Sequence, residues 1–238
     1  MVKNFNNYFG RIYQARYLSG IAAGLNTKTN KIGYVAAMGL DNSEVTGGID
    51  AFALGIYSVN PDAEVYVKVT NSWYDPKAEE EAARKLLDMN CDVIAQHCDT
   101  VYPQTLAQQK GVYSIGYNSD MSKEAPEACL CSVIWNWSAY YTSAVQSVID
   151  GTWDGSNYYG GMNENLVSIT PIADFAAAAT KEKVNMAKQQ ILSGKNGVFD
   201  GVIETNTGAE VGTAGKTLED SVITGGINWY FKTVKVIE

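Results

Sequence analysis

The chain has 238 residues, with 18 Lys and Arg against 26 Asp and Glu, so its net charge is −8. This balance argues against nucleic acid as a partner and against a basic membrane-surface protein, because both bind phosphate through clustered Lys and Arg. Hydrophobic residues make up 46% of the chain, enough for a packed core, and no apolar run reaches the roughly 20 residues of a membrane span. The length predicts one or two domains.

Two periodicities alternate along the chain. Runs rich in β-branched and aromatic residues, such as KIGYVAAM (31–38), alternate with stretches whose apolar residues recur every three or four positions. This order predicts an α/β fold with a parallel sheet and right-handed crossovers. In chain order, we expect strands at 31–38, 63–70, 91–96, 111–118, 129–135 and 166–170, and helices at 44–59, 76–90, 100–110, 137–150 and 179–193.

Cysteine and histidine usage bears on metal and redox chemistry. The four cysteines, Cys91, Cys98, Cys129 and Cys131, form no CxxC pair, and His97 is the one histidine. These residues are too few and wrongly spaced for a zinc site, so we expect no metal and no cofactor. We expect four half-buried thiols; a Cys91–Cys98 or an inter-strand disulfide is the alternative.

Polar and aromatic residues cluster where the predicted strands end. In open parallel sheets, ligands bind beyond the carboxyl ends of the strands. Indole faces stack on flat rings, and carboxylates and carboxamides read the edges of such rings, so the pattern predicts a site for a purine or a sugar. The candidate residues are Asn71, Trp73, Gln96, His97, Asp99, Asn118, Asp120, Trp135, Asn136 and Trp137.

Catalysis is the weaker interpretation of the same edge. Asp99 and Asp120 are a candidate acid/base pair for a glycosidase. Cys98 and His97 are adjacent in a predicted strand and point to opposite faces, which argues against a nucleophile pair. No nucleophile elbow, P-loop or dinucleotide-binding glycine motif is present. The sequence therefore predicts a binding protein rather than an enzyme.

Long stretches of the chain resemble one known family. NYFGRIYQARYLSGIAAGLNTKTNKIGYVAAM, TNSWYDPKAEEEAARKL, GVYSIGYNSDM and SVIWNW occur in order and resemble the BMP (PnrA-like) family of ABC-transporter substrate-binding proteins. The resemblance covers essentially the whole chain. It implies a type I periplasmic-binding-protein fold, with parallel sheets flanked by helices in two lobes that close on a ligand.

The resemblance also implies a domain organisation in which the first lobe is incomplete. Residues 1–133 correspond to the second, ligand-binding lobe, 134–175 to the returning helix and strand of the first lobe, and 176–238 to a second-lobe helix and the C-terminal tail. Family members begin with a lipoprotein signal and most of the first lobe, whereas MVKNFNNYFG lacks the apolar core of a signal peptide. A segment 134–175 without its sheet partners exposes apolar edges, so we expect self-association.

Family members that bind purine nucleosides hold the base between aromatic rings, and the resemblance assigns the second-lobe ring to Trp73. It places Asp120 at an acidic ligand-binding position. Trp135 stands where a ribose-binding lysine is expected, which favours a free base such as adenine over a nucleoside. We expect His97, Asp99, Asn118 and Asp120 to read the edge of the base, Asn71 to lie beside them, and Trp135 and Trp137 to form the hinge-side wall.

The resemblance implies a non-enzymatic solute-binding component of an ABC importer, with the ABC permease as its partner, at the cell surface or in the periplasm. The alternative is a cytoplasmic ligand sensor or regulator that reuses the fold, which the missing signal peptide favours. A glycosidase using Asp99 and Asp120 is the third hypothesis.

Overall fold

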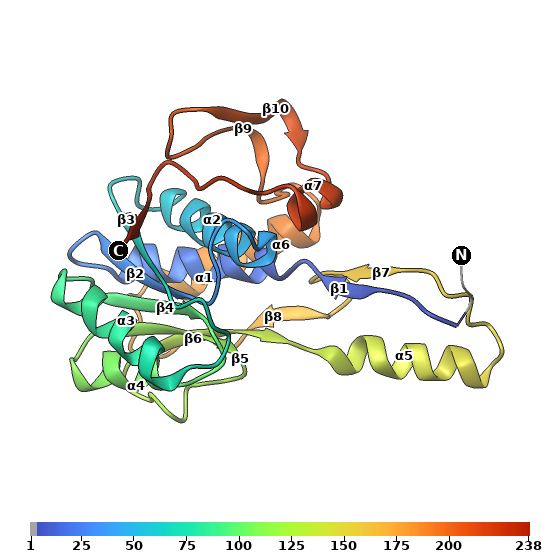
Figure 1. The fold of residues 1–238 in the computed structure, drawn as a ribbon, viewed down its shortest axis with the longest axis horizontal. Helices are drawn as coiled ribbons and strands as arrows, with labels where there is room; N and C mark the ends of the chain where they lie inside the picture. Colours follow the sequence, from blue (N-terminus) through green and yellow to red (C-terminus); the bar gives the residue numbers. More distant parts are fainter. Residues whose placement is uncertain (1–3) are drawn as a thin grey trace.

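A sheet of seven strands lies at the centre of the molecule (Figure 1). It is described from a computed structural model of residues 4–238, so positions 1–3 of the predicted 1–133 lobe lie outside the described residues. The strands are β2 (Lys31–Ala36), β3 (Glu64–Val69), β4 (Val93–His97), β5 (Tyr113–Asn118), β6 (Cys129–Trp135), β8 (Val167–Ile169) and β11 (Val234–Ile237). Their order across the sheet is β11-β3-β2-β4-β5-β6-β8.

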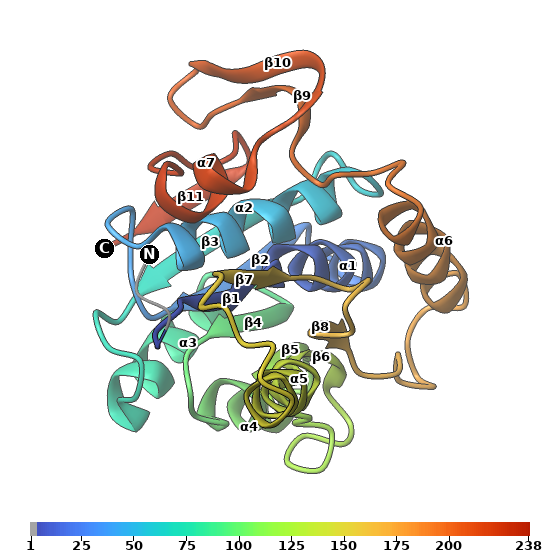
Figure 2. The ribbon, with the colours of Figure 1, turned by 90° about the vertical axis from the view of Figure 1, so that its right-hand side faces the viewer.

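Helices cover both faces of this sheet, as Figure 2 shows end-on. The helices are α1 (Ile12–Asn26), α2 (Ser43–Tyr57), α3 (Pro76–Asp88), α4 (Tyr102–Gln109), α5 (Trp137–Ile149), α6 (Thr180–Leu192) and α7 (Asp220–Gly225). Helices α1 and α2 lie on one face and α3 and α4 on the other, whereas α6 packs on α1, α7 packs on α2 and α5 projects away from the sheet. Alternation along β2 separates two cores: Ile32 and Tyr34 pack on the side of α1 and α2, whereas Val35 packs on the side of α3. The predicted α/β class is confirmed.

One feature of the predicted sheet is wrong. The strand expected at 166–170 forms, but β8 runs antiparallel to β6, whereas the remaining pairs in the sheet are parallel. The reason is the path of the chain, which leaves the sheet through β6 and α5 and returns through β8 in the opposite direction. The edge strand β11, only four residues long, was absent from the prediction.

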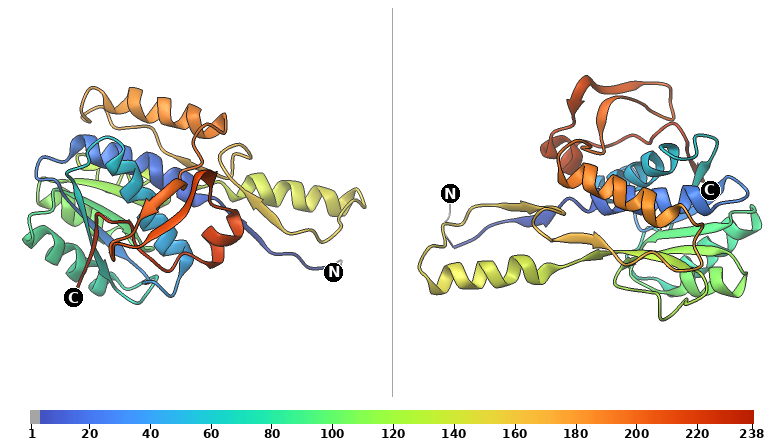
Figure 3. Two further views of the ribbon diagram at one scale, coloured as in Figure 1. Left: turned by 90° about the horizontal axis from the view of Figure 1, so that it is seen from above. Right: turned by 180° about the vertical axis from the view of Figure 1, so that it is seen from behind.

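A narrow extension projects from the body of the molecule (Figures 1 and 3). It consists of α5 and a parallel pair of three-residue strands, β1 (Tyr8–Gly10) and β7 (Tyr158–Gly160). A separate hairpin of β9 (Asp200–Glu204) and β10 (Glu210–Thr217) lies on the other side of α2 from the sheet. Because β8 pairs with β6, the central sheet includes part of the predicted 134–175 segment; the division into lobes stays a prediction.

The four cysteines are free, in agreement with the expected thiols and against the alternative disulfide, but they are buried rather than half-buried. Cys129 and Cys131 nevertheless belong to different core clusters. A register shift between β5 and β6 pairs Cys129 with Ser114 and Cys131 with the next residue, Ile115. The bulge therefore removes the simple alternation that would place both thiols on one face.

Helices α1 and α2 pack at backbone contact, because glycines face each other across their interface. A Cβ atom on Gly20 would lie 2.1 Å from the carbonyl oxygen of Phe52, and one on Gly55 would lie 2.1 Å from that of Tyr17. Backbone atoms of two helices cannot yield as the tip of a side chain can. The contact sets the distance between α1 and α2, and therefore the position of every residue they bring to the sheet edge.

We expect Gly20→Ala to lower the free energy of unfolding by about 2 kcal/mol or more, because the added methyl group forces the two helices apart. Urea denaturation followed by circular dichroism measures this change. The matched control is Gly225→Ala, whose Cβ would meet no atom within 4 Å; it should be neutral or gain up to about 1 kcal/mol of helix propensity. Equal stability of the two variants would contradict the proposed contact.

Candidate ligand-binding site

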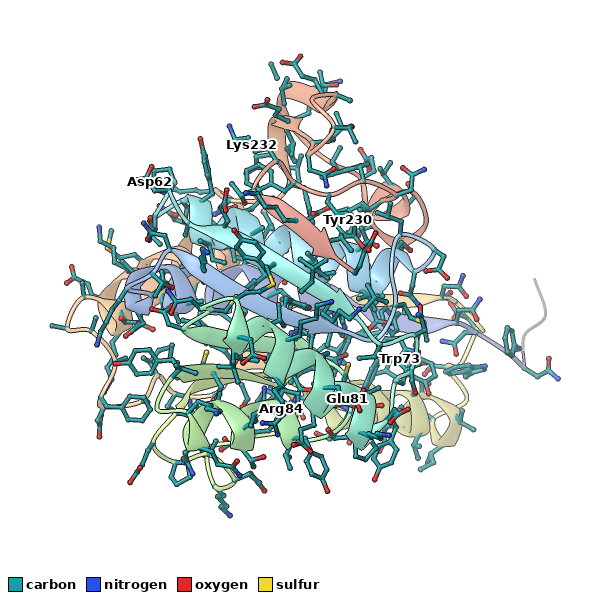
Figure 4. The ribbon with its side chains drawn as sticks, turned by 60° about the vertical axis from the view of Figure 1, so that its left-hand side comes forward. Asp62, Trp73, Glu81, Arg84, Tyr230 and Lys232 are labelled. Carbon is teal, nitrogen blue, oxygen red and sulfur yellow. The ribbon has the colours of Figure 1, made fainter. Side chains whose placement is uncertain are left out.

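The aromatic residues predicted at the sheet edge form a connected layer with a buried histidine. His97, the last residue of β4, is fully buried. Its ring meets the edge of Trp73 at 5.8 Å between centroids and that of Tyr117 at 4.5 Å. The Tyr34 hydroxyl lies 3.3 Å from its Nδ1. Figure 4 shows Trp73 beyond the carboxyl end of β3, on the side from which β1 projects.

A buried cation lies within this layer. Arg16 of α1 has no exposed surface and donates one hydrogen bond, from Nη1 to the carbonyl oxygen of Gln96 at 2.6 Å. Its guanidinium lies over the rings of Tyr117, at 4.1 Å, and Tyr34, at 5.6 Å. Its Nε and Nη2 have no hydrogen-bond partner among the described residues. Ring faces thus compensate in part for a charge that lacks a directly bonded carboxylate.

Glu44 supplies the anion that faces this cluster. Its Oε1 accepts a hydrogen bond from the Tyr117 hydroxyl at 3.4 Å and lies 3.5 Å from His97 Nε2. Burial alone would raise the pKa of Glu44, but His97, Arg16 and Tyr117 outweigh burial and hold that pKa below its ordinary value. Burial and the charge of Arg16 lower the pKa of His97 to about 4. Near neutral pH the cluster therefore holds a cation, a neutral imidazole and a carboxylate.

Trp135 and Trp137, predicted to form one wall of the site, stack on each other. The rings of Trp135 and Trp137 are 4.6 Å apart and 12° from parallel, and Phe9 of β1 lies 5.2 Å from Trp135. Trp135 Nε1 donates to the Tyr117 hydroxyl at 3.1 Å. Trp135 therefore connects the extension to the buried layer, and its indole N–H is already used.

Asn71, Asp99, Asn118 and Asp120 lie outside this layer and are exposed. Asn118 donates to Asp99 Oδ1 at 3.2 Å, whereas Asp120 accepts from the backbone of Ser122 at 3.0 Å. Asn71 is exposed and has a left-handed backbone, with φ of 56°. Burial raises the pKa of Asp99, and the Asn118 hydrogen bond opposes that rise. The two aspartates thus have separate partners; their roles toward a ligand stay predictions.

A pocket of about 290 Å³ opens beside the layer. Its lining includes aromatic rings of the extension and of α1, together with the N-terminal turn of α2, and its charged groups are Asp41 and Glu44. The predicted site residues are not part of this lining. The sequence indicated this position, since Asp41 lies three residues after the end of the predicted strand 31–38 and Glu44 begins the predicted helix 44–59. The lining residues are Phe9, Gly10, Ile12, Tyr13, Asp41, Asn42, Ser43, Glu44, Gly47, Tyr159, Ile223 and Thr224.

Comparison with known proteins gives the family. A family model described as "ABC transporter substrate-binding protein PnrA-like" matches residues 2–197. The chain is 36% identical over 227 residues to a purine-binding protein of Brucella abortus, covering 95% of this chain and 64% of the relative. It is 38% identical over 199 residues to a putative ABC transporter glucose-binding protein of Haloferax volcanii, covering 84% and 50%. It therefore belongs to the PnrA-like family of ABC transporter substrate-binding proteins, and it spans half to two thirds of these relatives.

Solved structures agree on the fold. A transcriptional activator of the comK gene from Bacillus halodurans has a TM-score of 0.72 at 20% identity, covering 82% of this chain and 68% of the other. An ABC transporter solute-binding protein from Aeropyrum pernix has a TM-score of 0.68 at 18% identity, covering 79% and 64%. The type I periplasmic-binding-protein fold implied by the sequence is confirmed. Among the described residues, no helix is long and apolar enough to cross a membrane.

Burial of His97 makes stability depend on pH. The unfolded chain binds a proton at His97 below about pH 6.5, whereas the folded chain binds it only near pH 4. Between these pH values the chain takes up a proton at His97 when it unfolds. The contribution of His97 to the free energy of unfolding, up to about 3 kcal/mol, is therefore lost as the pH falls from about 6.5 to about 4. Denaturant midpoints measured from pH 7 to pH 4 for the wild type and His97→Gln isolate it.

The quantity to compare is the difference in the free energy of unfolding between the wild type and His97→Gln. The wild type alone does not suffice, because the raised pKa values of Asp50 and Glu79 change the stability with pH in the opposite direction. Both carboxyls stabilise the fold more as the pH falls, in wild type and variant alike. The stability gap between wild type and His97→Gln should therefore narrow toward pH 4. A gap independent of pH would show that His97 titrates normally in the folded chain.

Proposed function

We propose that the chain is part of the solute-binding component of an ABC importer and that its ligand is a purine. The observation that carries this proposal is the aromatic layer of Trp73, Trp135 and Trp137 beside a pocket of about 290 Å³ at the carboxyl edge of a parallel sheet. Flat rings with polar edges are bound by such surroundings. The relative named as a purine-binding protein supports the choice of ligand class.

Among purines we favour a free base, such as adenine, over a nucleoside. The resemblance implies a ribose-binding lysine at position 135, where this chain has Trp135, and the Trp135 ring stacks on that of Trp137. Neither indole supplies the cationic donor that a ribose hydroxyl would take. Trp73 is assigned to stacking, and the exposed polar groups Asn71, Asp99, Asn118 and Asp120 are assigned to the edge of the ring. His97, expected from the sequence to read that edge, is fully buried and is assigned a supporting role beneath Trp73.

The proposed ABC permease partner and the location outside the cytoplasm follow from family membership. The remaining hypotheses are a regulator and a glycosidase. The similarity in fold to a transcriptional activator is the observation that keeps the regulator as the second candidate. The separate hydrogen bonds of Asp99 and Asp120 give no support to a joint acid/base role.

Calorimetric titration of the chain at pH 7 with adenine, adenosine and glucose tests the ligand class. We expect binding in the order adenine, adenosine, glucose, and a loss of about tenfold or more in adenine affinity for Trp73→Ala, because stacking on a base is worth about 1–3 kcal/mol. Tyr74→Ala, which removes a neighbouring exposed aromatic residue, is the control. Heat with glucose and none with either purine would overturn the purine proposal.

We also propose that the chain self-associates through α5. This helix contains no charged residue, and Val145, Val148 and Ile149 are 61%, 61% and 72% exposed. An uncharged apolar helix face in a chain of net charge −8 fits a second copy of itself, because the same face on both copies is complementary without charge pairing.

Light scattering after size exclusion should therefore show a dimer for the wild type and a monomer for Val145→Glu/Val148→Glu, since each added carboxylate would have to lose water in the contact. Met186→Glu, at an exposed apolar position of α6, is the matched control and should leave the dimer intact. A monomeric wild type, or dissociation by both changes, would contradict an α5 interface.

A further inference from the structure

We propose that Glu44 determines the specificity of the pocket, with its Oε2 accepting a hydrogen bond from an N–H group on the rim of a bound heterocycle. This inference rests on the proposed function, because it names the group that recognises the purine. It places a hydrogen bond to the ligand at the first turn of α2, in addition to the exposed residues at the end of the sheet. The observations behind it are the position of the carboxylate, the fixation of one of its oxygens and the character of the surrounding wall.

The two oxygens of Glu44 differ in their surroundings. Oε1 faces inward, toward the Tyr117 hydroxyl at 3.4 Å and His97 Nε2 at 3.5 Å. Among the described residues, none donates a hydrogen bond to Oε2. The Glu44 side chain is 23% exposed and lines the pocket of about 290 Å³. A carboxylate with one oxygen held by the protein and the other free is arranged to accept from a ligand.

The local structure does not itself require Glu44. The N-cap of α2 is Asn42, whose side chain accepts from the backbone N–H of Val45 at 3.1 Å. The capping bond at the start of the helix is therefore made by Asn42 and not by Glu44. A carboxylate at this position still gains from the positive end of the helix and from the buried charge of Arg16.

Two buried side chains, those of His97 and Tyr117, hold the carboxylate in place. His97 lies against Gly48, where a Cβ atom would come within 2.9 Å of the imidazole. Tyr117 is held in turn by Trp135 Nε1 at 3.1 Å and by the Arg16 guanidinium over its ring at 4.1 Å. These residues are positioning residues, and a carboxylate fixed in this way loses little rotamer freedom when a ligand binds.

The wall of the pocket defines the ligand chemistry. Phe9, Tyr13 and Tyr159 are the aromatic residues of the lining, and the charged side chains in the lining, Asp41 and Glu44, are both acidic. A flat neutral ring with an amino or ring N–H group meets both conditions. A phosphorylated ligand would place its negative charge beside two carboxylates, so the pocket selects bases over nucleotides.

Calorimetric titration with adenine at pH 7 tests this assignment on four proteins: wild type, Glu44→Gln, Tyr117→Phe and Glu81→Gln. Removing a charged acceptor should weaken adenine binding by about 10- to 100-fold. Glu81→Gln removes the same charge from an exposed position of α3 (Figure 4) and should stay within about twofold of wild type, since exposed charges contribute little. Tyr117→Phe removes the donor to Oε1 and should have a smaller effect than Glu44→Gln.

The outcomes separate the two proposals. Adenine binding by the wild type with unchanged affinity in Glu44→Gln overturns the role of Glu44 and leaves the proposed function standing. No adenine binding by the wild type overturns both. If Glu44→Gln is unfolded at the titration temperature, the wild type is titrated with adenosine monophosphate instead. Binding at least tenfold weaker than that of adenine supports the selection against phosphate by Asp41 and Glu44. Equal binding overturns it.

Discussion

The buried guanidinium of Arg16 is the interaction on which the sheet edge depends. A charge without exposed surface needs polarisable or polar neighbours on every side, and here they are the rings of Tyr34 and Tyr117 and the carbonyl oxygen of Gln96. Burial, together with this charge, lowers the pKa of His97, and, despite burial, the contact with His97, together with this charge, lowers the pKa of Glu44. Arg16 of α1, His97 of β4 and Glu44 of α2 are therefore coupled electrostatically. In this arrangement the Glu44 carboxylate faces the pocket.

The close contact of α1 and α2 makes this arrangement possible. With side chains larger than hydrogen at Gly20 and Gly55, the helices could not meet at the distance observed. Gly48 has a related role beside the His97 ring. The glycines of this region therefore set the distances between the helices and the sheet. The hydrogen bonds of the polar cluster depend on these distances, because a hydrogen bond weakens when its two atoms move apart by a few tenths of an ångström.

The alternation of strand and helix could be predicted because each period reports a local geometry, two for a strand and 3.6 for a helix. The strands β1, β7 and β11 were not predicted, because runs of three or four residues show too little alternation to identify, and the hairpin of β9 and β10 was not predicted either. The equally short β8 was predicted because it lies within the longer run LVSIT, residues 166–170. The direction of β8 escaped for a different reason, since a strand's sequence does not encode the side from which the chain returns. Trp73, His97 and Trp135 were found as strand-end residues, and the structure brings them into one layer.

By itself, the sequence determined the α/β class, the family and the edge of the sheet where aromatic and polar residues gather. These properties follow from local periods, from strand ends and from long stretches of resemblance. Only the tertiary structure decided that His97 is buried, that Arg16 lies beneath Tyr117, and that Glu44 lines the pocket. The physical reason is that burial and charge pairing arise between elements distant in sequence, whose approach is governed by helix packing.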